Sequence, residues 1–365
     1  MVHQKDVFVL DLKSLISQCF RLNAPTSGRV SVLLNCRFLG LMEEAYTMTT
    51  SNDLLVVTSS PHVHSPDSVP NAMRDVLIAL CPALIAGLYF FRLPALLVIL
   101  SCVASAYIAE IVCLKVMKKA PTGEGSAIIT GLLLAFCVPP HLPVWMAALG
   151  SIFSIVIAKH LFGGLGQNIF NPALIGRAFL LASFPVAMTS WSRPLDGVTT
   201  ATPLGIMKEA TGQALPSLGE LFLGSVSGSI GETSAIAVLL GGAYLLYRGH
   251  IDWRIPGTFL GTVFVLMAIA GAIKGQGLWY PFFHLSAGGL FLGAFFMATD
   301  WVTSPVTKRG RVLFGIGCGL LVVLIRLKGG YPEGVAYSIL LMNVVTPLID
   351  RYTRSRVFGG VKSHA

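Results

Sequence analysis

The sequence predicts an all-α polytopic membrane protein, with about ten transmembrane segments in two inverted halves of five helices each. Hydrophobic residues make up 54% of the 365 positions and charged residues only 12%, whereas a soluble domain carries about 25% charged residues. Mean hydropathy is +0.74. The apolar runs are continuous rather than alternating as in a β-barrel. Because backbone polar groups in lipid must pair within their own segment, we expect helices.

Eight apolar runs approach the roughly 20 residues that a helix needs to cross a bilayer. They cover residues 73–91, 94–114, 143–158, 172–190, 235–247, 255–273, 309–327 and 331–349. Two further runs are short, because Ala127–Val138 ends at Pro139 and Leu285–Thr299 ends at Asp300. At about 1.5 Å per residue, each short run spans only roughly 18–23 Å. We therefore expect partial or broken helices at these two places.

Each short run is the third segment of a group of five, which predicts an internal repeat. Residues 59–190 form the first predicted half, 191–234 a polar loop, and 235–350 the second half. A Gly-Gly pair follows the fourth segment in both halves, at Gly163 and at Gly329. Short segments at corresponding places indicate a site near the midplane of the bilayer.

Basic residues on alternating loops predict the orientation. If the chain before residue 73 lies inside, the inside residues are Lys115, Lys118, Lys119, Lys159, Arg248, Arg254, Lys308, Arg309, Arg311, Arg351, Arg354, Arg356 and Lys362. The outside residues are Arg92, Arg193, Lys208, Lys274, Arg326 and Lys328. Both termini, including the basic tail 351–365, are therefore expected to be cytoplasmic, and the loop 191–234 extracytoplasmic.

The N-terminal segment 1–58 is predicted to be cytoplasmic and peripheral. Its first residues mix charged and apolar side chains, so we expect no cleavable signal peptide. Residues 1–47 are either a small appended element or the product of a misassigned start before Met48. The basic residues behind the net charge of +9 lie in short clusters between apolar runs. This distribution is better explained by the orientation of the chain in the membrane than by nucleic-acid binding. The seven cysteines form no CxxC pair, and no metal site is expected.

Three features of the sequence could carry chemistry. The first is a group of threonines in the polar loop, Thr199, Thr200 and Thr202, which precede Pro203. Either their hydroxyls are accessible for chemistry, or Thr202 only caps a helix that begins at Pro203. The second feature is the glycine-rich segment 162–173.

Asn168 and Asn171 of that segment could hydrogen-bond a planar heterocycle, or cap the next helix. The third feature consists of ionisable residues at membrane depth, which are costly in lipid and therefore indicate function by default. These are Glu110, Arg177 and Asp300. Glu110 and Asp300 could instead reach the interface or cap a helix, and Arg177 could bind an anion or form an interhelical salt bridge.

From about Ser59 to Asp350 the sequence resembles the D subunit of the Rnf (Rsx) electron-transport complexes, which is related to the B subunit of the sodium-translocating NADH:quinone oxidoreductase. The motifs that carry the resemblance are Ser59-Ser60-Pro61-His62, the segment 160–173, the segment 196–204, Met297-Ala-Thr-Asp300 with Thr303-Ser304-Pro305, and Tyr331-Pro-Glu-Gly-Val-Ala-Tyr-Ser338.

This resemblance implies a flavin-carrying membrane subunit that has no catalytic residues of its own. Its complex would couple electron transfer, between ferredoxin or a similar donor and NAD or quinone, to ion translocation. In the family, FMN is joined through its phosphate to the last threonine of a Ser/Thr-Gly-Ala-Thr motif, which here reads Thr199, Thr200, Ala201, Thr202. The acceptor would be Thr202, as a phosphothreonyl ester. The chain departs from the pattern at Thr200, where glycine is common.

The resemblance also implies further sites and partners. Asn168 and Asn171 would lie near a noncovalent riboflavin, and Glu110 and Asp300 become candidates for the ion pathway. The partners would be other membrane and peripheral subunits that supply iron–sulfur centres, a flavin transferase and membrane lipid, in a bacterial cytoplasmic (inner) membrane. The alternatives are a secondary transporter or channel without a redox cofactor, and a structural scaffold.

Overall fold

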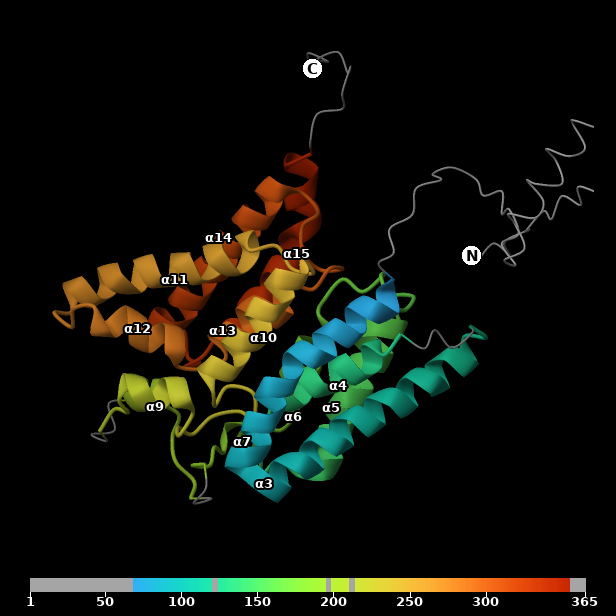
Figure 1. Ribbon diagram of the computed structural model, residues 1–365, viewed down its shortest axis with the longest axis horizontal. Helices are drawn as coiled ribbons and strands as arrows, with labels where there is room; N and C mark the ends of the chain where they lie inside the picture. Colours follow the sequence, from blue (N-terminus) through green and yellow to red (C-terminus); the bar gives the residue numbers. More distant parts are fainter. Residues whose placement is uncertain (1–67, 120–123, 195–197, 210–213, 355–365) are drawn as a thin grey trace, which may run out of the picture. The chain divides into compact units, whose positions relative to one another are not determined.

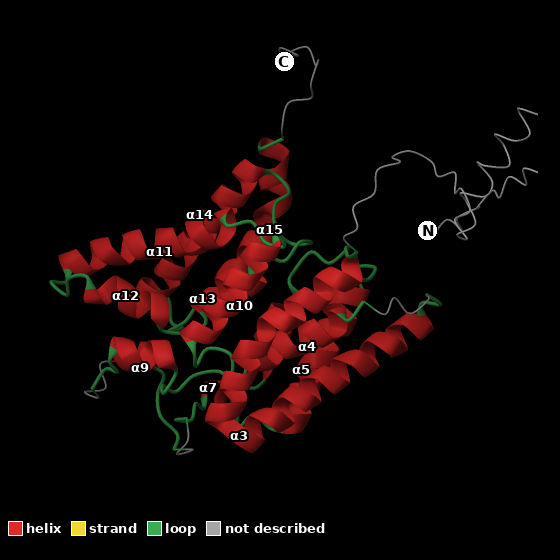
Figure 2. Cartoon of the chain, viewed as in Figure 1, coloured by secondary structure: helices red, strands yellow, loops and turns green. Residues whose placement is uncertain are grey.

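A computed structural model describes residues 68–119, 124–194, 198–209 and 214–354 (Figure 1). The predicted segment 1–58, the motif at Ser59, Asp196 and most of the basic tail lie outside the described residues. Within these described ranges the regular structure is helical, with no β-strand and only one isolated bridge, between Ser192 and Thr199 (Figure 2). The predicted all-α class is therefore confirmed.

The first group of helices follows the predicted segments closely. Its helices are α3 (Val69–Val116), α4 (Ser126–Phe136), α5 (Val144–Phe153), the π-helix η1 (Ser154–His160), α6 (Pro172–Ser183) and α7 (Pro185–Thr189). Two predicted spans lie within α3, which is broken at Arg92 (φ 51°, ψ −129°). Pro94 lies two residues after the break and has no backbone N–H to donate to the Phe90 carbonyl, so it removes one hydrogen bond of a continuous helix. The predicted span 172–190 is likewise divided, at Phe184 before Pro185.

The second group of helices is broken at its third segment. The helices are α10 (Ala235–Arg248), α11 (Arg254–Ile273), α12 (Trp279–Ser286), α13 (Leu290–Leu292), the π-helix η2 (Gly293–Met297), α14 (Lys308–Lys328) and α15 (Val335–Tyr352). A partial or broken helix was expected over Leu285–Thr299. The structure has a break within this run, where α12 and the α13–η2 helix meet at an angle of 66°. Gly288 lies in the bend with φ +78°, a conformation that favours glycine.

Two short helices lie in the polar loop between these groups. They are α8 (Pro203–Glu209) and α9 (Leu218–Leu223). A capping box begins α9, because the Ser217 hydroxyl accepts from the Glu220 backbone while the Glu220 carboxylate accepts from the Ser217 backbone.

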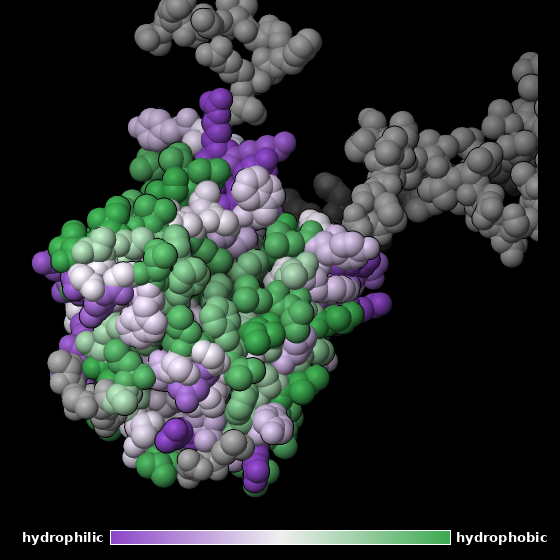
Figure 3. Space-filling model, turned by 60° about the vertical axis from the view of Figure 1, so that its left-hand side comes forward, coloured by the Kyte–Doolittle hydropathy of each residue, from purple (hydrophilic) through white to green (hydrophobic). Residues whose placement is uncertain are grey.

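Three of the described helices, α3, α11 and α14, are long and apolar enough to cross a membrane. The bent pair of α12 with α13 and η2 is a fourth if it is counted as one span. The four shorter apolar helices have 10–17 residues. Figure 3 shows one face with hydrophobic residues across its middle and polar residues gathered toward its ends. These properties are those of a membrane protein; the full set of ten spans remains a prediction.

The two short third segments form the centre of the fold. Ten of the eleven residues of α4 are buried, and so are all five residues of η2. A helix that is hydrophobic and buried all round belongs to the core of a helical bundle. α4 packs against α3, α5 and α6, whereas η2 packs against α10, α11 and α15 (Figure 1). The ends of these segments meet, with Cys137 Sγ 4.0 Å from Met297 Sδ.

Candidate cofactor and ion sites

The threonine motif is held by a turn in the polar loop. The Arg193 amide donates to the Val198 carbonyl at 2.8 Å, and the Thr200 amide donates to the Trp191 carbonyl at 3.0 Å. The chain therefore folds back and lays Thr199 and the residues after it beside residues 191–193. The Ser227 hydroxyl donates to the Ala201 carbonyl at 2.6 Å and ties the motif to the end of the loop.

Thr202 caps α8, as one of the two readings of the sequence predicted. Its Oγ1 accepts a hydrogen bond from the Gly205 amide at 3.1 Å, and its carbonyl accepts from the Ile206 amide at 2.9 Å. Pro203 takes the first helical position, where its missing N–H costs nothing. Thr202 is half-buried and also lines a pocket, so the residue that caps the helix is also accessible from the pocket.

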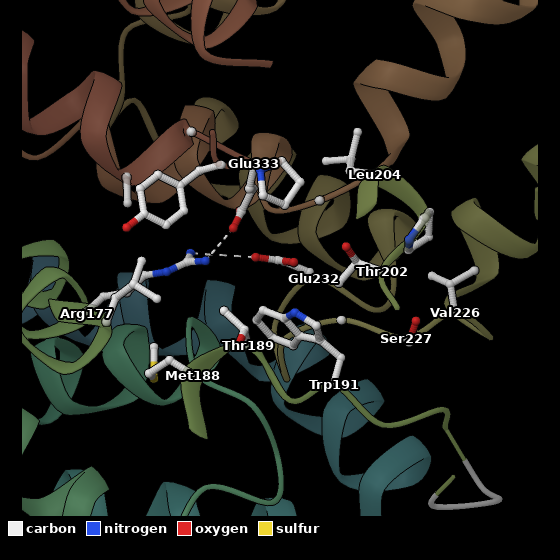
Figure 4. A pocket seen from close by; sticks show the side chains of 18 of the residues that line it. Arg177, Met188, Thr189, Trp191, Thr202, Leu204, Val226, Ser227, Glu232 and Glu333 are labelled. Carbon is white, nitrogen blue, oxygen red and sulfur yellow. Dashed lines mark hydrogen bonds and ion pairs between the residues drawn. The ribbon is translucent and has the colours of Figure 1, made fainter. Parts of the chain in front are cut away.

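This first pocket lies between the polar loop and both groups of helices (Figure 4). Its polar and aromatic lining consists of Arg177, Thr189, Trp191, Thr202, Ser227, Glu232, Tyr331, Glu333 and Tyr337. The cavity measures about 90 Å³, well below the roughly 300–1,000 Å³ of ordinary small-molecule sites. It has room for a phosphate-sized group, but not for a whole dinucleotide-sized or flavin-sized ligand.

A buried ion-pair cluster forms the floor of this pocket. Arg177 from α6 forms ion pairs with Glu333 and, at 3.7 Å, with Glu232. Figure 4 shows the Arg177 guanidinium directed toward both carboxylates. Glu333 Oε1 accepts from the Gly289 amide at 3.1 Å. Arg177 therefore forms a salt bridge, as one reading of the sequence predicted, but the bridge is not interhelical because its partners lie in the loops that precede α10 and α15.

Arg326 completes the cluster from α14. Its Nε donates to the Glu333 carbonyl at 3.2 Å, and its other nitrogens donate to the His284 and Ala287 carbonyls at the bend between α12 and α13. Charge counting placed Arg326 in an exposed outside loop, but it is 6% exposed within α14. That placement was wrong because a basic residue near a helix end can turn inward when carbonyls are free there.

Sequence reasoning missed Glu232 and the role of Glu333. Both precede helices in glycine-containing loops, where a carboxylate is normally solvated. Glu333 was quoted only as part of the family motif, and nothing near Glu232 marks it. Their burial depends on Arg177, which is far away in the chain.

A second pocket brings together the other predicted site residues. Its cavity measures about 400 Å³. Among its polar lining residues are Ser126, Thr130, Lys159, Asn168, Asn171, His250, Thr299 and Asp300. The predicted riboflavin residues and the predicted ion-pathway residue Asp300 thus line one cavity, separate from the pocket at Thr202.

Both asparagines of this second pocket also serve the local backbone. Asn171 Oδ1 accepts from the Ala173 amide at 3.0 Å and so caps α6, while its Nδ2 donates to the Met297 carbonyl at 3.2 Å. Asn168 Nδ2 donates to the Phe170 carbonyl at 3.0 Å. The capping alternative is confirmed for Asn171. Its amide also joins the two groups of helices at the end of η2.

The acidic residues near the second pocket each have a polar partner, which is an ion pair for Glu110 and a hydrogen bond for Asp300. Glu110 forms an ion pair with Lys159, whose Nζ also donates to the Ser126 hydroxyl at 2.8 Å. Charge counting placed Lys159 in an inside loop, but it is 2% exposed within η1, and that placement was wrong. Asp300 Oδ2 accepts from the Thr303 hydroxyl at 3.2 Å. Lys159 therefore links Glu110 to the pocket that contains Asp300.

A third cavity, of about 590 Å³, adjoins the second pocket. The two share four lining residues, namely His250, Ile251, Thr299 and Trp301. His250 lies 2.6 Å from Asp75 of α3, and its carbonyl accepts from Trp301 Nε1 at 2.6 Å. The second pocket and the third cavity thus meet at His250 and Trp301.

Long apolar helices, third segments that are short or bent, and internal polar pockets are the features of an integral membrane protein. Residues 56–359 match the NQR2, RnfD, RnfE family, and the chain belongs to this family. The predicted family membership is therefore confirmed.

The relatives are similar over nearly their whole length. The chain is 51% identical over 320 residues to the D subunit of the proton-translocating ferredoxin:NAD(+) oxidoreductase complex of Clostridium ljungdahlii, with 84% of this chain and 97% of the relative covered. It is 51% identical over 313 residues to the D subunit of the Na(+)-translocating ferredoxin:NAD(+) oxidoreductase complex of Acetobacterium woodii, covering 84% and 96%. It is 41% identical over 344 residues to the D subunit of the ion-translocating oxidoreductase complex of Citrobacter koseri, covering 83% and 98%.

Proposed function

We propose that the chain is the D subunit of a membrane complex that couples electron transfer between ferredoxin and NAD to ion translocation. The observation that carries this proposal is 51% identity to two D subunits of such complexes over at least 96% of their length. The chain is one part of a translocase and acts with the other membrane and peripheral subunits. Its membrane is the bacterial inner membrane. The two relatives are named for different ions at equal identity, so both proton and sodium are ions to test.

We propose that Thr202 carries FMN as a phosphoester, attached by a flavin transferase. The residues present fit this group. The Thr202 hydroxyl faces a cavity of phosphate size, and an ester oxygen keeps a lone pair that can still accept from the Gly205 amide. Thr200 has a negative φ, so the glycine that is common there in the family is not required by the backbone. When bound, FMN supplies one-electron and two-electron redox chemistry.

The protein's own part at this site is to anchor the phosphate and to surround it with charge. The cavity is too small for the flavin ring, so the ring would have to lie outside it. Arg177 and the two glutamates set the electrostatic field around the anchor. Trp191 and Tyr331 offer aromatic surface at the rim.

We also propose that the second pocket contains the ion pathway and a noncovalent riboflavin. Its volume of about 400 Å³ lies within the range of small-molecule sites, and Asn168 and Asn171 offer amides to a planar ring. Asp300 and the Glu110–Lys159 pair supply the charges that ion movement needs at membrane depth.

The proposed topology is ten spans in two inverted halves, with both termini cytoplasmic. It is supported by equivalent packing, because the second and fourth segments contact each other in both groups, as α3 with α5 and α11 with α14. The third segments are short or bent in both, and their ends meet at the centre.

Denaturing electrophoresis of the complex tests the FMN proposal. The wild-type subunit is expected to fluoresce as a flavoprotein, and Thr202→Val to lose the fluorescence because it lacks the acceptor oxygen. Thr199→Val is the matched control, since Thr199 is an exposed threonine of the same motif and should keep the flavin. Equal fluorescence of wild type and Thr202→Val would reject Thr202 as the anchor.

A further inference from the structure

The carboxyl groups of Glu232 and Glu333 lie together beneath the Thr202 pocket. A Cβ atom built on Gly289 would lie 2.7 Å from Glu232 Oε1 and 2.8 Å from Glu333 Oε1. Both carboxylates also form ion pairs with the same Arg177 guanidinium. Two carboxyls this close share one proton rather than ionise together, as in carboxyl dyads.

The groups around this pair come from six parts of the fold. They are Arg177 of α6, Arg326 of α14 with Tyr280 of α12 near it, Cys137 after α4, Ser229 of the same loop as Glu232, and Tyr331 and Tyr337 around the start of α15. With both carboxyls ionised, the two arginines balance them. With one proton bound, the cluster carries one positive charge. The cluster therefore has two protonation states, one with both carboxyls ionised and one with a single proton on the pair.

The two carboxyls lie in loops, before α10 and before α15, and their environments differ. Burial raises the pKa of Glu232 to about 8. Burial also acts on Glu333, but the Arg177 guanidinium outweighs it and holds the pKa of Glu333 below its usual value. Glu232 is therefore the carboxyl that holds a proton below about pH 8, whereas above that pH it is ionised and can bind a proton when negative charge is added nearby.

A second observation points to proton exchange at Glu232. The Ser229 hydroxyl is fully buried and has no hydrogen-bond partner at normal distance among the described residues, although it lies beside the Glu232 carboxyl. Buried hydroxyls are normally satisfied. When the Glu232 carboxyl loses its proton, the Ser229 hydroxyl can donate a hydrogen bond to the carboxylate and stabilise it. Both glutamates also line the pocket at Thr202, which provides a route for the proton.

We propose that the Glu232–Glu333 pair is a proton-binding site coupled to the redox state of the flavin on Thr202. Above about pH 8, where Glu232 is ionised, Glu232 would gain one proton from the pocket when the complex delivers one electron from ferredoxin to this site, and an O–H bond would form on its carboxylate oxygen. When the electron leaves for the next carrier, that O–H bond would break and the proton would return to the pocket. The proton offsets the added negative charge, which is costly in a buried site. This proposal rests on the FMN anchor at Thr202.

Redox-induced infrared difference spectroscopy of the assembled complex tests the proposal, together with flavin midpoint potentials at several pH values. The wild type is expected to show a carboxyl C=O signal that shifts in D₂O, and a midpoint potential that falls as pH rises. Glu232→Gln should keep FMN but lose that signal and flatten the pH dependence. Glu232→Asp should restore both, because it restores an ionisable carboxyl. Glu209→Gln, which changes an exposed glutamate of the polar loop, should behave as wild type.

The contradicting outcomes separate the two proposals. Absence of a D₂O-sensitive carboxyl signal in the wild type would overturn the proton site, even if Glu232→Gln does not assemble. The same holds if Glu232→Gln carries FMN and keeps the wild-type pH dependence. Absence of FMN from the wild-type Thr202 peptide would instead overturn the flavin anchor, and the proton site with it.

Discussion

At the scale of single residues, the sequence identified ionisable side chains at membrane depth but not the residues that pair with them. Arg177 was recognised because a charge at membrane depth requires compensation. Its partners Glu232 and Glu333 are 55 and 156 positions away, and pairing over such distances depends on tertiary packing. Thr202 was predicted correctly as a helix cap because a cap depends only on its neighbours. Its place in a pocket beside the ion-pair cluster became visible only in the structure.

Gly289 tests the geometry of the carboxyl pair. An added methyl group would press on both carboxylates, so Gly289→Ala is expected to destabilise the protein by about 1–3 kcal/mol, as overpacking does. The φ of Gly289 is −75°, so backbone strain does not contribute. The midpoint of thermal unfolding in detergent measures the effect.

Gly261→Ala is the matched control for this prediction. Gly261 lies in α11 with nothing within 4 Å of an added Cβ, so the substitution should leave the unfolding midpoint unchanged or raise it slightly. Equal midpoints for the two variants would contradict the close approach at Gly289.

At the scale of helices, the sequence predicted positions better than breaks. The starts of α10, α11 and α14 agree with the predicted spans to within one residue, because apolar runs and their polar ends determine both. The bend between α12 and α13 lies in the run where a partial or broken helix was expected, but most of α12 was not predicted. The run Trp279–Ser286 contains His284 and was read as loop, yet the histidine is buried and the Arg326 side chain binds the carbonyls at the bend.

The loop between α10 and α11 is joined to α14 through Asp252. Burial opposes ionisation of Asp252, but hydrogen bonds from Arg254 and Arg311 outweigh it and hold the pKa of this carboxyl below its usual value. The carboxylate therefore stabilises the fold above its unfolded pKa of about 3.9. That contribution is lost as pH falls through the lower folded pKa.

Asp252→Asn is accordingly expected to lower stability at pH 7 by roughly 1 kcal/mol or less, because both arginines are about a third exposed. The difference between wild type and variant should shrink below about pH 4. Thermal unfolding measured at pH 7 and at acidic pH provides the comparison. A difference that grows on acidification would contradict the ion-pair account.

At the scale of the whole molecule, two polar pockets divide the predicted functions. In our proposal the pocket at Thr202 anchors FMN, whereas the pocket that contains Asp300 holds the ion pathway and the riboflavin. The sequence singled out Thr202 at one pocket and Asn168, Asn171 and Asp300 at the other, but it missed Glu232 and the role of Glu333. It did not predict that Asn168, Asn171 and Asp300 share one cavity, because they belong to different groups of helices.

Asp300→Asn tests this division. The substitution removes the ionisable group of the second pocket but leaves the Thr202 pocket intact, so ion uptake by the complex in liposomes should fall several-fold more than electron transfer. Sodium and proton uptake are measured beside electron transfer from ferredoxin to NAD. Glu209→Gln, on the exposed end of α8, is the control. Unchanged ion uptake, or loss of both activities together, would contradict a pathway through Asp300.

The mass of the peptide that contains Thr202, isolated from the assembled native complex, tests the central claim most directly. The account predicts this peptide with the mass of one FMN attached through a phosphoester, and a fragment spectrum that places the added mass on Thr202. A bare Thr202 peptide from active complex, or FMN on Thr199 or Thr200 instead, would contradict it.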